Sequence, residues 1–254
     1  MKLSVVIITF NEEANIEKCL SSVQGIADEI VVVDSFSTDN TEQLCRKYTT
    51  QFIQRTFDGY GKQKQFATHQ ATYDYILSLD ADESLSKELY QSIVNAKNSL
   101  PADAYSFNRL NFYCNTPIRY CGWYPDKQVR LFNRKKENWN NRNVHETVDL
   151  PKGSTVVHLK GDLLHYTCDS IQEHRGKEKK YAWINAHIIA EKKASVSIFT
   201  PYVKSVFRFI KTYVIKLGFL DGYYGFAISR TLALSSFHKY YWARQLIRKK
   251  TRCV

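Results

Sequence analysis

The sequence predicts an α/β fold: a mostly parallel, Rossmann-like sheet flanked by helices, followed by a basic, amphipathic helical extension at the C-terminus. The first observation behind this prediction is the alternation of β-branched apolar runs with helical patterns over the first hundred residues. The second is a hydrophobic content of 44% in 254 residues, enough for one large domain or a domain with an appendage. The third is charge: residues 175–254 carry 17 Lys and Arg against 3 Asp and Glu, whereas residues 1–174 carry 19 against 22.

Four apolar runs in the first hundred residues predict strands, at 3–10, 29–34, 51–55 and 73–80. Between them, polar N-cap signals and helical spacing predict helices over 11–23, 37–48 and 61–72. Strands separated by helices pair in parallel and are covered on both faces. Ligands of such sheets bind beyond the carboxyl ends of the strands, so the residues that follow each strand are the first candidates for a site.

The middle of the chain predicts more exposed strands, at 104–115, 127–134, 143–148 and 154–167. We expect these strands to extend the sheet and to shape a pocket. The predicted domains are therefore 1–168, with halves at 1–100 and 101–168, and a helical extension at 169–254.

The extension predicts a helix over 170–193 and a second over 201–218. In the second, an apolar stripe lies on one side and basic residues on the other: Lys204, Arg208 and Lys211. This arrangement indicates either an in-plane contact with a membrane surface or helices that pack on the body with their cations in water. A nucleic acid is the other anionic partner to consider, but the sequence carries none of the standard nucleic-acid signatures, so we expect none.

The remaining composition predicts a cytoplasmic protein. The N-terminal run MKLSVVIITF lacks the cleavage site of a signal peptide, and no uncharged apolar run approaches the ~18 residues of a spanning helix. The six cysteines form no CxxC pairs and are expected to be reduced thiols that mostly fill the core. Together with the basic extension, these features predict a location peripheral to the inner face of the cytoplasmic membrane.

Acidic residues gather where the predicted strands end. Asp34 follows the second strand, and Asp80, Asp82 and Glu83 follow the fourth. Helix capping accounts for one such residue but less well for several together. Alternation along the chain predicts that Asp80 and Asp82 point together as oxygen ligands for Mg²⁺ or Mn²⁺, completed by substrate phosphates. Glu83 is expected to point away and to serve the start of the helix that follows.

The segments SVVIITFNEEANI, EIVVVDSFSTDNT and ILSLDADE resemble the nucleotide-sugar half of the family 2 glycosyltransferases, which have a GT-A fold. The later segments GYGKQKQFA, WYPDKQVRLFNR, NVHE, GDLLHYT and GFLDGYYG extend the resemblance to nearly the whole chain. They are similar to lipopolysaccharide core β-1,4-glucosyltransferases that act on inner-core heptose.

The resemblance implies a nucleotide-sugar site, with a UDP-sugar as donor. The residues implied in binding the base and ribose are Thr9, Asn11, Glu12, Asp34 and Asp80. Lys62 follows two glycines and would contact phosphate, unless it is simply a residue at the exposed start of a helix; Lys64 is a weaker candidate for the same role.

The resemblance also implies a metal site and an acceptor site. Asp82 would bind the metal, with Asp80 as a possible second ligand, and His165 is either a further ligand or a structural histidine. Glu146 in NVHE is the expected base, with Asp126 as runner-up; alternatively Glu146 pairs with Arg142 on the surface. Arg130 and Arg134 are expected to contact acceptor phosphates.

The sequence therefore predicts an inverting, metal-dependent glycosyltransferase that moves glucose from UDP-glucose to a lipid-linked saccharide, the lipopolysaccharide inner core. UDP-galactose, or a capsule or exopolysaccharide acceptor, is the alternative within the class. A nucleotide-binding membrane adaptor without transferase activity is the alternative outside it. The sequence leaves open the sugar, the linkage, the metal and the oligomeric state.

Overall fold

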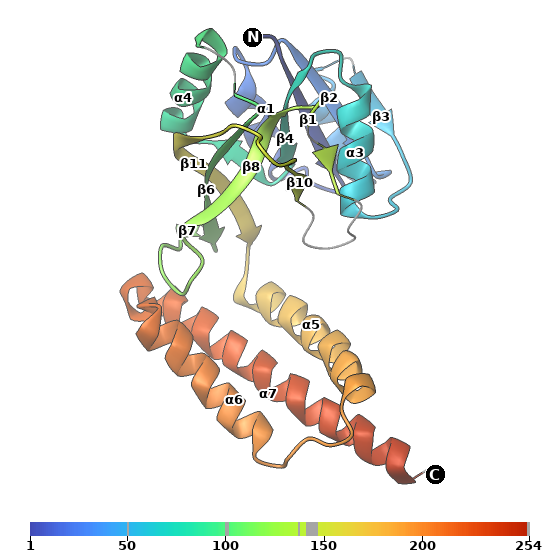
Figure 1. Cartoon of the computed structure of the whole chain (residues 1–254), viewed down its shortest axis with the longest axis vertical. Coiled ribbons are helices and arrows are strands. Elements are labelled where there is room, and N and C mark those ends of the chain that lie inside the picture. The colour runs from blue at the N-terminus through green and yellow to red at the C-terminus, as the bar shows by residue number, and fades with distance from the viewer. Residues whose placement is uncertain (50, 100–101, 137, 141–146, 253–254) are drawn as a thin grey trace. The chain divides into compact units, whose positions relative to one another are not determined.

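The structure is a computed structural model that describes residues 1–49, 51–99, 102–136, 138–140 and 147–252. It divides the chain into two compact units (Figure 1). The sheet unit comprises Met1–Leu110 and Asp126–Tyr166, and the helical unit comprises Asn111–Pro125 and Thr167–Val254.

The first half of the sheet unit alternates strands and helices as the sequence predicts. Its elements are β1 (Leu3–Thr9), α1 (Ile16–Val23), β2 (Glu29–Asp34), α2 (Thr41–Cys45), β3 (Gln51–Gln54), α3 (Tyr60–Gln70) and β4 (Tyr75–Asp80). α1 begins later than expected because a turn comes first: the carbonyl of Glu12 accepts hydrogen bonds from the backbone N–H groups of Asn15 and Ile16. α2 is also shorter than the helix expected over 37–48.

The later strands build the other half of the sheet. The elements are β5 (Glu83–Leu85), α4 (Lys87–Asn98), β6 (Ala104–Tyr113), β7 (Thr116–Pro117), β8 (Asp126–Asn133), β9 (Asn138–Trp139), β10 (Val148–Asp149) and β11 (Val156–Cys168). β9 and β10 pair as a separate two-stranded ribbon. β6 and β11 continue beyond the sheet unit into residues of the helical unit.

The main sheet is mixed, with its strands in the order β3-β2-β1-β4-β8-β6-β11-β5. The strands from β3 to β4 are parallel, whereas β8 pairs antiparallel with both β4 and β6, and β11 pairs antiparallel with β5. The register of the parallel strands pairs Thr9 with Asp34 and Ile8 with Asp80. The carboxyl ends of β1, β2 and β4 therefore meet at one edge of the sheet.

β1 shows why helices cover both faces of the sheet, since every one of its residues is buried. Val5 and Ile7 belong to a core that includes residues of α1 and α4, whereas Val6 and Ile8 belong to a second core that includes Ala67 of α3 and Trp139. Because side chains alternate along a strand, such a sequence needs an apolar partner on each side. The predicted α/β class is confirmed.

The helical unit contains α5 (Ile171–Lys192), α6 (Thr200–Phe209), a π-helix (Ile210–Ile215), a 3₁₀ helix (Gly218–Asp221) and α7 (Gly222–Arg252). α7 packs along both α5 and α6 (Figure 1). The carboxylate of Asp221 accepts hydrogen bonds from the backbone N–H groups of Arg119 and Tyr120, at 3.0 and 2.9 Å, and so fixes the loop after β7. Among the residues that the structure describes, no helix combines the length and apolar character needed to span a bilayer.

The cysteines that the structure describes are free thiols. Cys19, Cys45, Cys121 and Cys168 are buried, and Cys114 is half-buried. The prediction that they mostly fill the core is consistent with this burial.

Candidate functional site

The ends of β1 and β2 are joined by hydrogen bonds among Asn11, Asp34 and Ser37. The Asp34 carboxylate is fully buried and accepts hydrogen bonds from the backbone N–H of Ser37, at 2.8 Å, and from its hydroxyl. The Ser37 hydroxyl accepts in turn from the backbone N–H of Asn11, at 2.8 Å. Asn11 has a φ of +53°, a left-handed conformation that asparagine tolerates better than most residues. The predicted pair of Asn11 and Asp34 is thus brought together, with Ser37 between them.

Thr9 and Glu12 lie at the same strand end. The hydroxyl of Thr9 is buried and has no hydrogen-bond partner within the described part of the chain, so it is available to a ligand. The backbone N–H of Glu12 donates to the Thr41 hydroxyl at 2.9 Å, and its carboxylate accepts from the Asn15 amide at 2.9 Å. Glu12 therefore fixes the turn that leads into α1.

Asp80 ends β4 between two buried cations. Lys64 of α3 places its Nζ 2.9 Å from Oδ1 and 3.0 Å from Oδ2, and Arg130 of β8 places Nη2 2.8 Å from Oδ2. Burial raises the pKa of Asp80, but the two cations outweigh this effect and hold the pKa well below its usual range. Both cations also lie over the indole ring of Trp139, at 4.8 Å for Lys64 Nζ and 5.4 Å for Arg130 Cζ. Asp80 is therefore an ionised carboxylate in a fixed orientation.

Glu83 belongs to this charge network, contrary to the prediction that it serves the next helix. It lies in β5, is fully buried, and accepts hydrogen bonds from the Asp80 backbone N–H at 3.0 Å and from Arg130 Nη2 at 2.7 Å. α4 is capped instead by the Ser86 hydroxyl, which accepts from the Leu89 backbone N–H at 3.2 Å. The prediction was wrong because β5 separates the acid from the helix.

The network continues to the runner-up base. Arg109 Nη1 lies 3.4 Å from Glu83, and the same guanidinium contacts Asp126 through Nη2 at 2.8 Å and Nε at 2.9 Å. Gln128 donates to the other oxygen of Asp126 at 2.7 Å. Asp126 is thus held by donors on both carboxylate oxygens.

Asp82 and His165 form a separate pair beside Asp80. The register of β11 against β5 places His165 opposite Glu83, and its Nε2 lies 3.2 Å from Asp82 Oδ2. The two side chains are partly exposed, at 25% for Asp82 and 16% for His165. The backbone N–H of Tyr166 donates to the carbonyl of Asp82 at 3.0 Å, which fixes the turn between β4 and β5.

These side chains fit a divalent metal only in part. Among the described residues there is no group of three or more His, Cys, Asp or Glu side chains arranged to hold a metal ion. Asp80 is already neutralised by Lys64 and Arg130, so the pair left to bind a metal is Asp82 and His165. Mg²⁺ and Mn²⁺ commonly take one or two protein ligands and complete their shell with water and substrate phosphate, which suits such a pair.

The other predicted residues lie elsewhere. Lys62 is half-exposed, with Nζ 3.8 Å from Asp58, so the lysine that reaches Asp80 is Lys64, the weaker candidate. Arg134 donates to the carbonyls of Thr68 and Thr72 at 3.1 Å and also to Ala71, where α3 ends. Since its neighbour Asn133 pairs with the first residue of β4, Arg134 lies at the opposite edge of the sheet from Asp80.

The expected base, Glu146, lies outside the described residues, as do His145 and Arg142. The functional residues that sequence reasoning did not name are Ser37, Arg109 and Trp139. Ser37 follows Asp34 closely enough to have been found as a turn partner. Nothing in the pattern around Arg109 or Trp139 indicates that they contact the acids.

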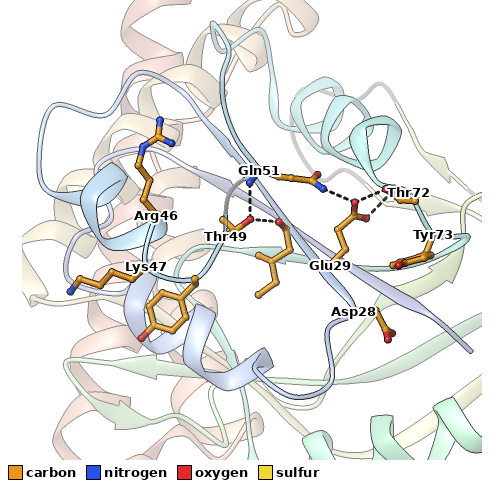
Figure 2. A pocket seen from close by; sticks show the side chains of 10 residues that line it. Asp28, Glu29, Arg46, Lys47, Thr49, Gln51, Thr72 and Tyr73 are labelled. Carbon is orange, nitrogen blue, oxygen red and sulfur yellow. Dashed lines mark hydrogen bonds between the residues drawn. The ribbon is translucent and has the colours of Figure 1, made fainter.

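A cavity of about 600 Å³ lies at the amino end of β2, away from this site (Figure 2). Glu29 crosses it and accepts hydrogen bonds from Thr72 and Gln51 (Figure 2). Burial raises the pKa of Glu29, and hydrogen bonds from Ser4, Thr72 and Gln51 more than offset this, so the pKa lies below its usual value. These hydrogen bonds join the amino ends of the strands. The residues that line the cavity therefore stabilise the sheet and take no part in the candidate site.

Comparison with known proteins identifies the family of the chain. The model of the family "Glycosyl transferase family 2" matches residues 4–153. The chain is 31% identical to an uncharacterized glycosyltransferase of Rickettsia prowazekii, covering 100% of this chain and 90% of the relative. It is 33% identical to the lipopolysaccharide core biosynthesis glycosyltransferase LpsC of Rhizobium meliloti, covering 73% of this chain and 71% of LpsC.

Among solved structures, the crystal structure of S. aureus TarS 1–349 in complex with UDP is similar with a TM-score of 0.47 and 16% identity, covering 100% of this chain and 92% of that one. The family model spans more than half of the chain, and the sequence relatives share about a third of its residues. The protein therefore belongs to glycosyl transferase family 2 and is a glycosyltransferase, with the α/β fold that its sequence predicts.

Proposed function

We propose that the protein is an inverting, metal-dependent glycosyltransferase that moves glucose from UDP-glucose to an inner-core heptose of lipopolysaccharide, or to a similar glycolipid. The observation that carries this proposal is that Asp80 and Asp82, at the end of β4, have different charged neighbours. Asp80 is matched by two buried cations, whereas Asp82 faces His165 alone among the charged side chains described. The lipopolysaccharide core as acceptor is supported by the similarity to LpsC.

Asp80 would bind the ribose of the donor. An ionised carboxylate offers about four lone-pair positions, and the contacts from Lys64 and Arg130 leave room for a hydroxyl donor. A carboxylate held in one orientation accepts such a hydroxyl without an ordering cost at the moment of binding. Asp34 and the free hydroxyl of Thr9 would contribute the remaining contacts to the base and ribose at the neighbouring strand ends.

Asp82 and His165 would hold the Mg²⁺ or Mn²⁺. A bound metal of this kind supplies charge neutralisation on the diphosphate leaving group. The protein contributes one carboxylate oxygen and one imidazole nitrogen on either side of that position, and the turn that carries Asp82 is fixed by the Tyr166 backbone N–H. Lys62 remains a proposal for a phosphate contact from the exposed start of α3.

Glu146 would be the base. It would take the proton of the acceptor hydroxyl while that oxygen forms a bond to the anomeric carbon, the bond from that carbon to the diphosphate breaks, and the configuration inverts. The contacts of Asp126 support this choice, because a carboxylate already engaged by Arg109 and Gln128 is poorly placed to accept another proton. Arg130 is engaged with Asp80 and Glu83, so it is better suited to support the donor site than to read an acceptor.

Two other functions would use the same fold. UDP-galactose, or a capsule or exopolysaccharide acceptor, would need only a different pocket around the sugar. A nucleotide-binding adaptor would use the same metal and donor residues to bind UDP and would lack only the transfer step. We further propose that the enzyme acts on its lipid-linked acceptor at the inner face of the cytoplasmic membrane.

A donor screen with a purified, truncated core acceptor tests the proposal. We expect release of UDP from UDP-glucose, loss of turnover with EDTA, and recovery with Mg²⁺ or Mn²⁺. Asp82→Asn should lower kcat/KM by about 10³-fold, since a metal contributes several kcal/mol to such a transfer, whereas the exposed Asp169→Asn should leave it unchanged.

Full activity of Asp82→Asn would overturn the metal assignment, and full activity of Glu146→Gln would overturn the base. Metal-dependent UDP binding without transfer to any acceptor would favour the adaptor.

A further inference from the structure

α6 and the π-helix turn most of their large apolar side chains outward. The inward row consists of Pro201, Ser205, Phe209 and Thr212, of which Pro201 and Thr212 are buried. Ser205 donates its hydroxyl to the Ala233 carbonyl of α7 at 2.9 Å. The outward row is at least 43% exposed and consists of Tyr202, Val203, Val206, Phe207, Ile210 and Val214. The stripe that the sequence predicts is therefore the exposed face of the helix.

The contact of α6 and the π-helix with α7 mixes small and aromatic residues. Ala233 of α7 is buried, and its carbonyl accepts the Ser205 hydroxyl. Phe226 of α7 packs against Phe209 and Tyr213 at ring-centroid distances of 6.0 and 5.9 Å. A helix that packs in water normally buries its large apolar residues and exposes its polar ones. The outward row departs from this rule because its large apolar side chains are exposed, so it has the composition expected of a face that meets an apolar medium.

The charges beside the outward row have one sign. At about 100° per residue, Lys211 and Lys204 fall beyond one edge of that row, and Arg208 lies farther round the same side of the helix. All three are exposed, and residues 194–220 contain no Asp or Glu. Long basic side chains at the edge of an apolar face reach the headgroup level of a bilayer and complement anionic lipid.

We propose that this face docks in the plane of a bilayer that contains anionic phospholipid, with the outward row at the boundary of headgroups and acyl chains. We call it the α6 surface: Tyr202, Val203, Val206, Phe207, Ile210 and Val214, with Lys204, Arg208 and Lys211. The inference deepens the proposed function, because it names the surface that would bring the enzyme to a lipid-linked acceptor, and it rests on that function for its biological purpose alone.

A bilayer fits the α6 surface better than the other occupants do. A second copy of the chain would bring the same three cations toward one another with no acid among residues 194–220 to pair with them, which disfavours a symmetric contact. A nucleic acid would engage the cations but would leave Val203, Val206 and Ile210 in water. A bilayer takes up both kinds of side chain at once.

Co-sedimentation of the full-length protein with vesicles tests the proposal. We expect binding to vesicles of phosphatidylcholine mixed with phosphatidylglycerol, and weaker binding to phosphatidylcholine alone. Lys204→Gln, Arg208→Gln and Lys211→Gln together should weaken binding to the anionic vesicles by roughly a hundredfold, at about fivefold for each cation near the surface. The matched control is Lys127→Gln, Lys152→Gln and Lys160→Gln, which removes the same charge from exposed residues of the sheet unit and should retain binding.

The apolar part is tested by Val206→Ser, Phe207→Ser and Ile210→Ser together, which should abolish binding to both vesicles. Its control is Leu150→Ser, Val156→Ser and Val157→Ser, which are similarly exposed in the sheet unit. Val203→Trp should strengthen binding, an effect that a misfolded variant would not give. UDP binding, measured without vesicles, should be the same in all variants, so that failure of the surface is distinguishable from failure of the donor site.

Two results from the triple serine variant would overturn the proposal. One is vesicle binding by the triple serine variant equal to that of the unchanged protein. The other is a change of oligomeric state in the same variant, measured by light scattering without vesicles, since that would make a second copy the occupant. Binding to RNA that competes fully with vesicles, and is lost in the glutamine variant alone, would likewise assign the cations to a nucleic acid.

Discussion

The interior of the sheet unit and the seams between the C-terminal helices are filled with opposite kinds of side chain. In the sheet unit, Leu77 and Leu79 of β4 are fully buried, and the charged Lys64 and Arg130 are buried with partners. In α5, the buried positions include Ala182, Ala186 and Ala190, at spacings of four residues, whereas Ile184 and Ile188 are more than 40% exposed.

The sheet unit and the helical unit of this chain therefore follow different packing rules. The sheet unit hides large aliphatic groups from water and satisfies its buried charges with opposite charges or, at Asp34, with hydrogen bonds from Ser37. The helical unit has an aromatic and aliphatic cluster around Tyr113 and Ile228. Farther along, the buried positions of α5 are alanines, and Trp183 of α5 packs edge-on against Trp242 of α7. The first rule is that of an enzyme core in water, and the second suits helices whose outer faces meet lipid.

The buried network of the sheet unit predicts the largest effect on stability. Arg130→Met should lower the free energy of unfolding by about 3–5 kcal/mol, because it removes the nearer guanidinium partner of the fully buried Glu83 and leaves only Arg109 at 3.4 Å. The exposed pair of Arg46 and Glu42, also at 2.7 Å, provides the matched control, since Arg46→Met should cost about 0–1 kcal/mol. Urea unfolding measures both, and equal costs would show that burial does not distinguish the two pairs.

The inward row of α5 predicts the next effect. Ala186→Leu should destabilise the protein by about 1–3 kcal/mol, because a larger side chain must enter a seam where Ala186 is fully buried. Ile184→Ser on the outward face should change stability by no more than about 0.5 kcal/mol. Urea unfolding measures both changes. A larger loss of stability for Ile184→Ser than for Ala186→Leu would reverse the assignment of the two faces of α5.

The sequence alone predicts the parallel half of the sheet. It does not predict where α1 starts or which way the apolar stripe of α6 faces, for physical reasons. The β-branched runs of β1, β2 and β4 leave few alternatives to buried strands. The late start of α1 depends on the left-handed conformation of Asn11 and the turn after it, which helical periodicity does not detect. In α6, periodicity found the apolar stripe but carries no information on whether that stripe faces a neighbour or the surroundings.

For the site, the strand-end acids could be read from the sequence because parallel strands share one edge. The pairing of Asp82 with His165 depends on the register of β11 against β5, a contact between segments about eighty residues apart. The partners of Asp80 come from α3 and β8, and no local spacing indicates that Lys64 rather than Lys62 points inward. The contacts of Glu83 also required the structure, because an acid near a helix start has a simpler explanation in sequence.

The ion pairs of Asp80 also make the stability of the sheet unit depend on pH. Burial raises the pKa of Asp80 and the two cations lower it by more, so its folded pKa lies below the unfolded value of about 3.9. Asp80 therefore contributes stability above about pH 4, and this contribution is lost as the pH falls. We expect the difference in unfolding free energy between the unchanged protein and Asp80→Asn to shrink between neutral pH and about pH 3. A difference that stays constant over this range would mean that the carboxylate charge contributes nothing.

Two glycines predict effects of opposite sign in the two units, and the stabilising one is the smallest effect expected. Gly176 lies within α5, is exposed, and has no atom within 4 Å of the position that a Cβ would take. Gly176→Ala should therefore stabilise the protein by about 0.5–1 kcal/mol, since alanine restricts the unfolded chain and suits a helix. Gly161 of β11 has a φ of +93°, and a Cβ there would lie 2.2 Å from the Leu89 nitrogen, so Gly161→Ala should destabilise. Thermal unfolding of the two variants measures the signs, and destabilisation by Gly176→Ala would show that the outward face of α5 is covered rather than open.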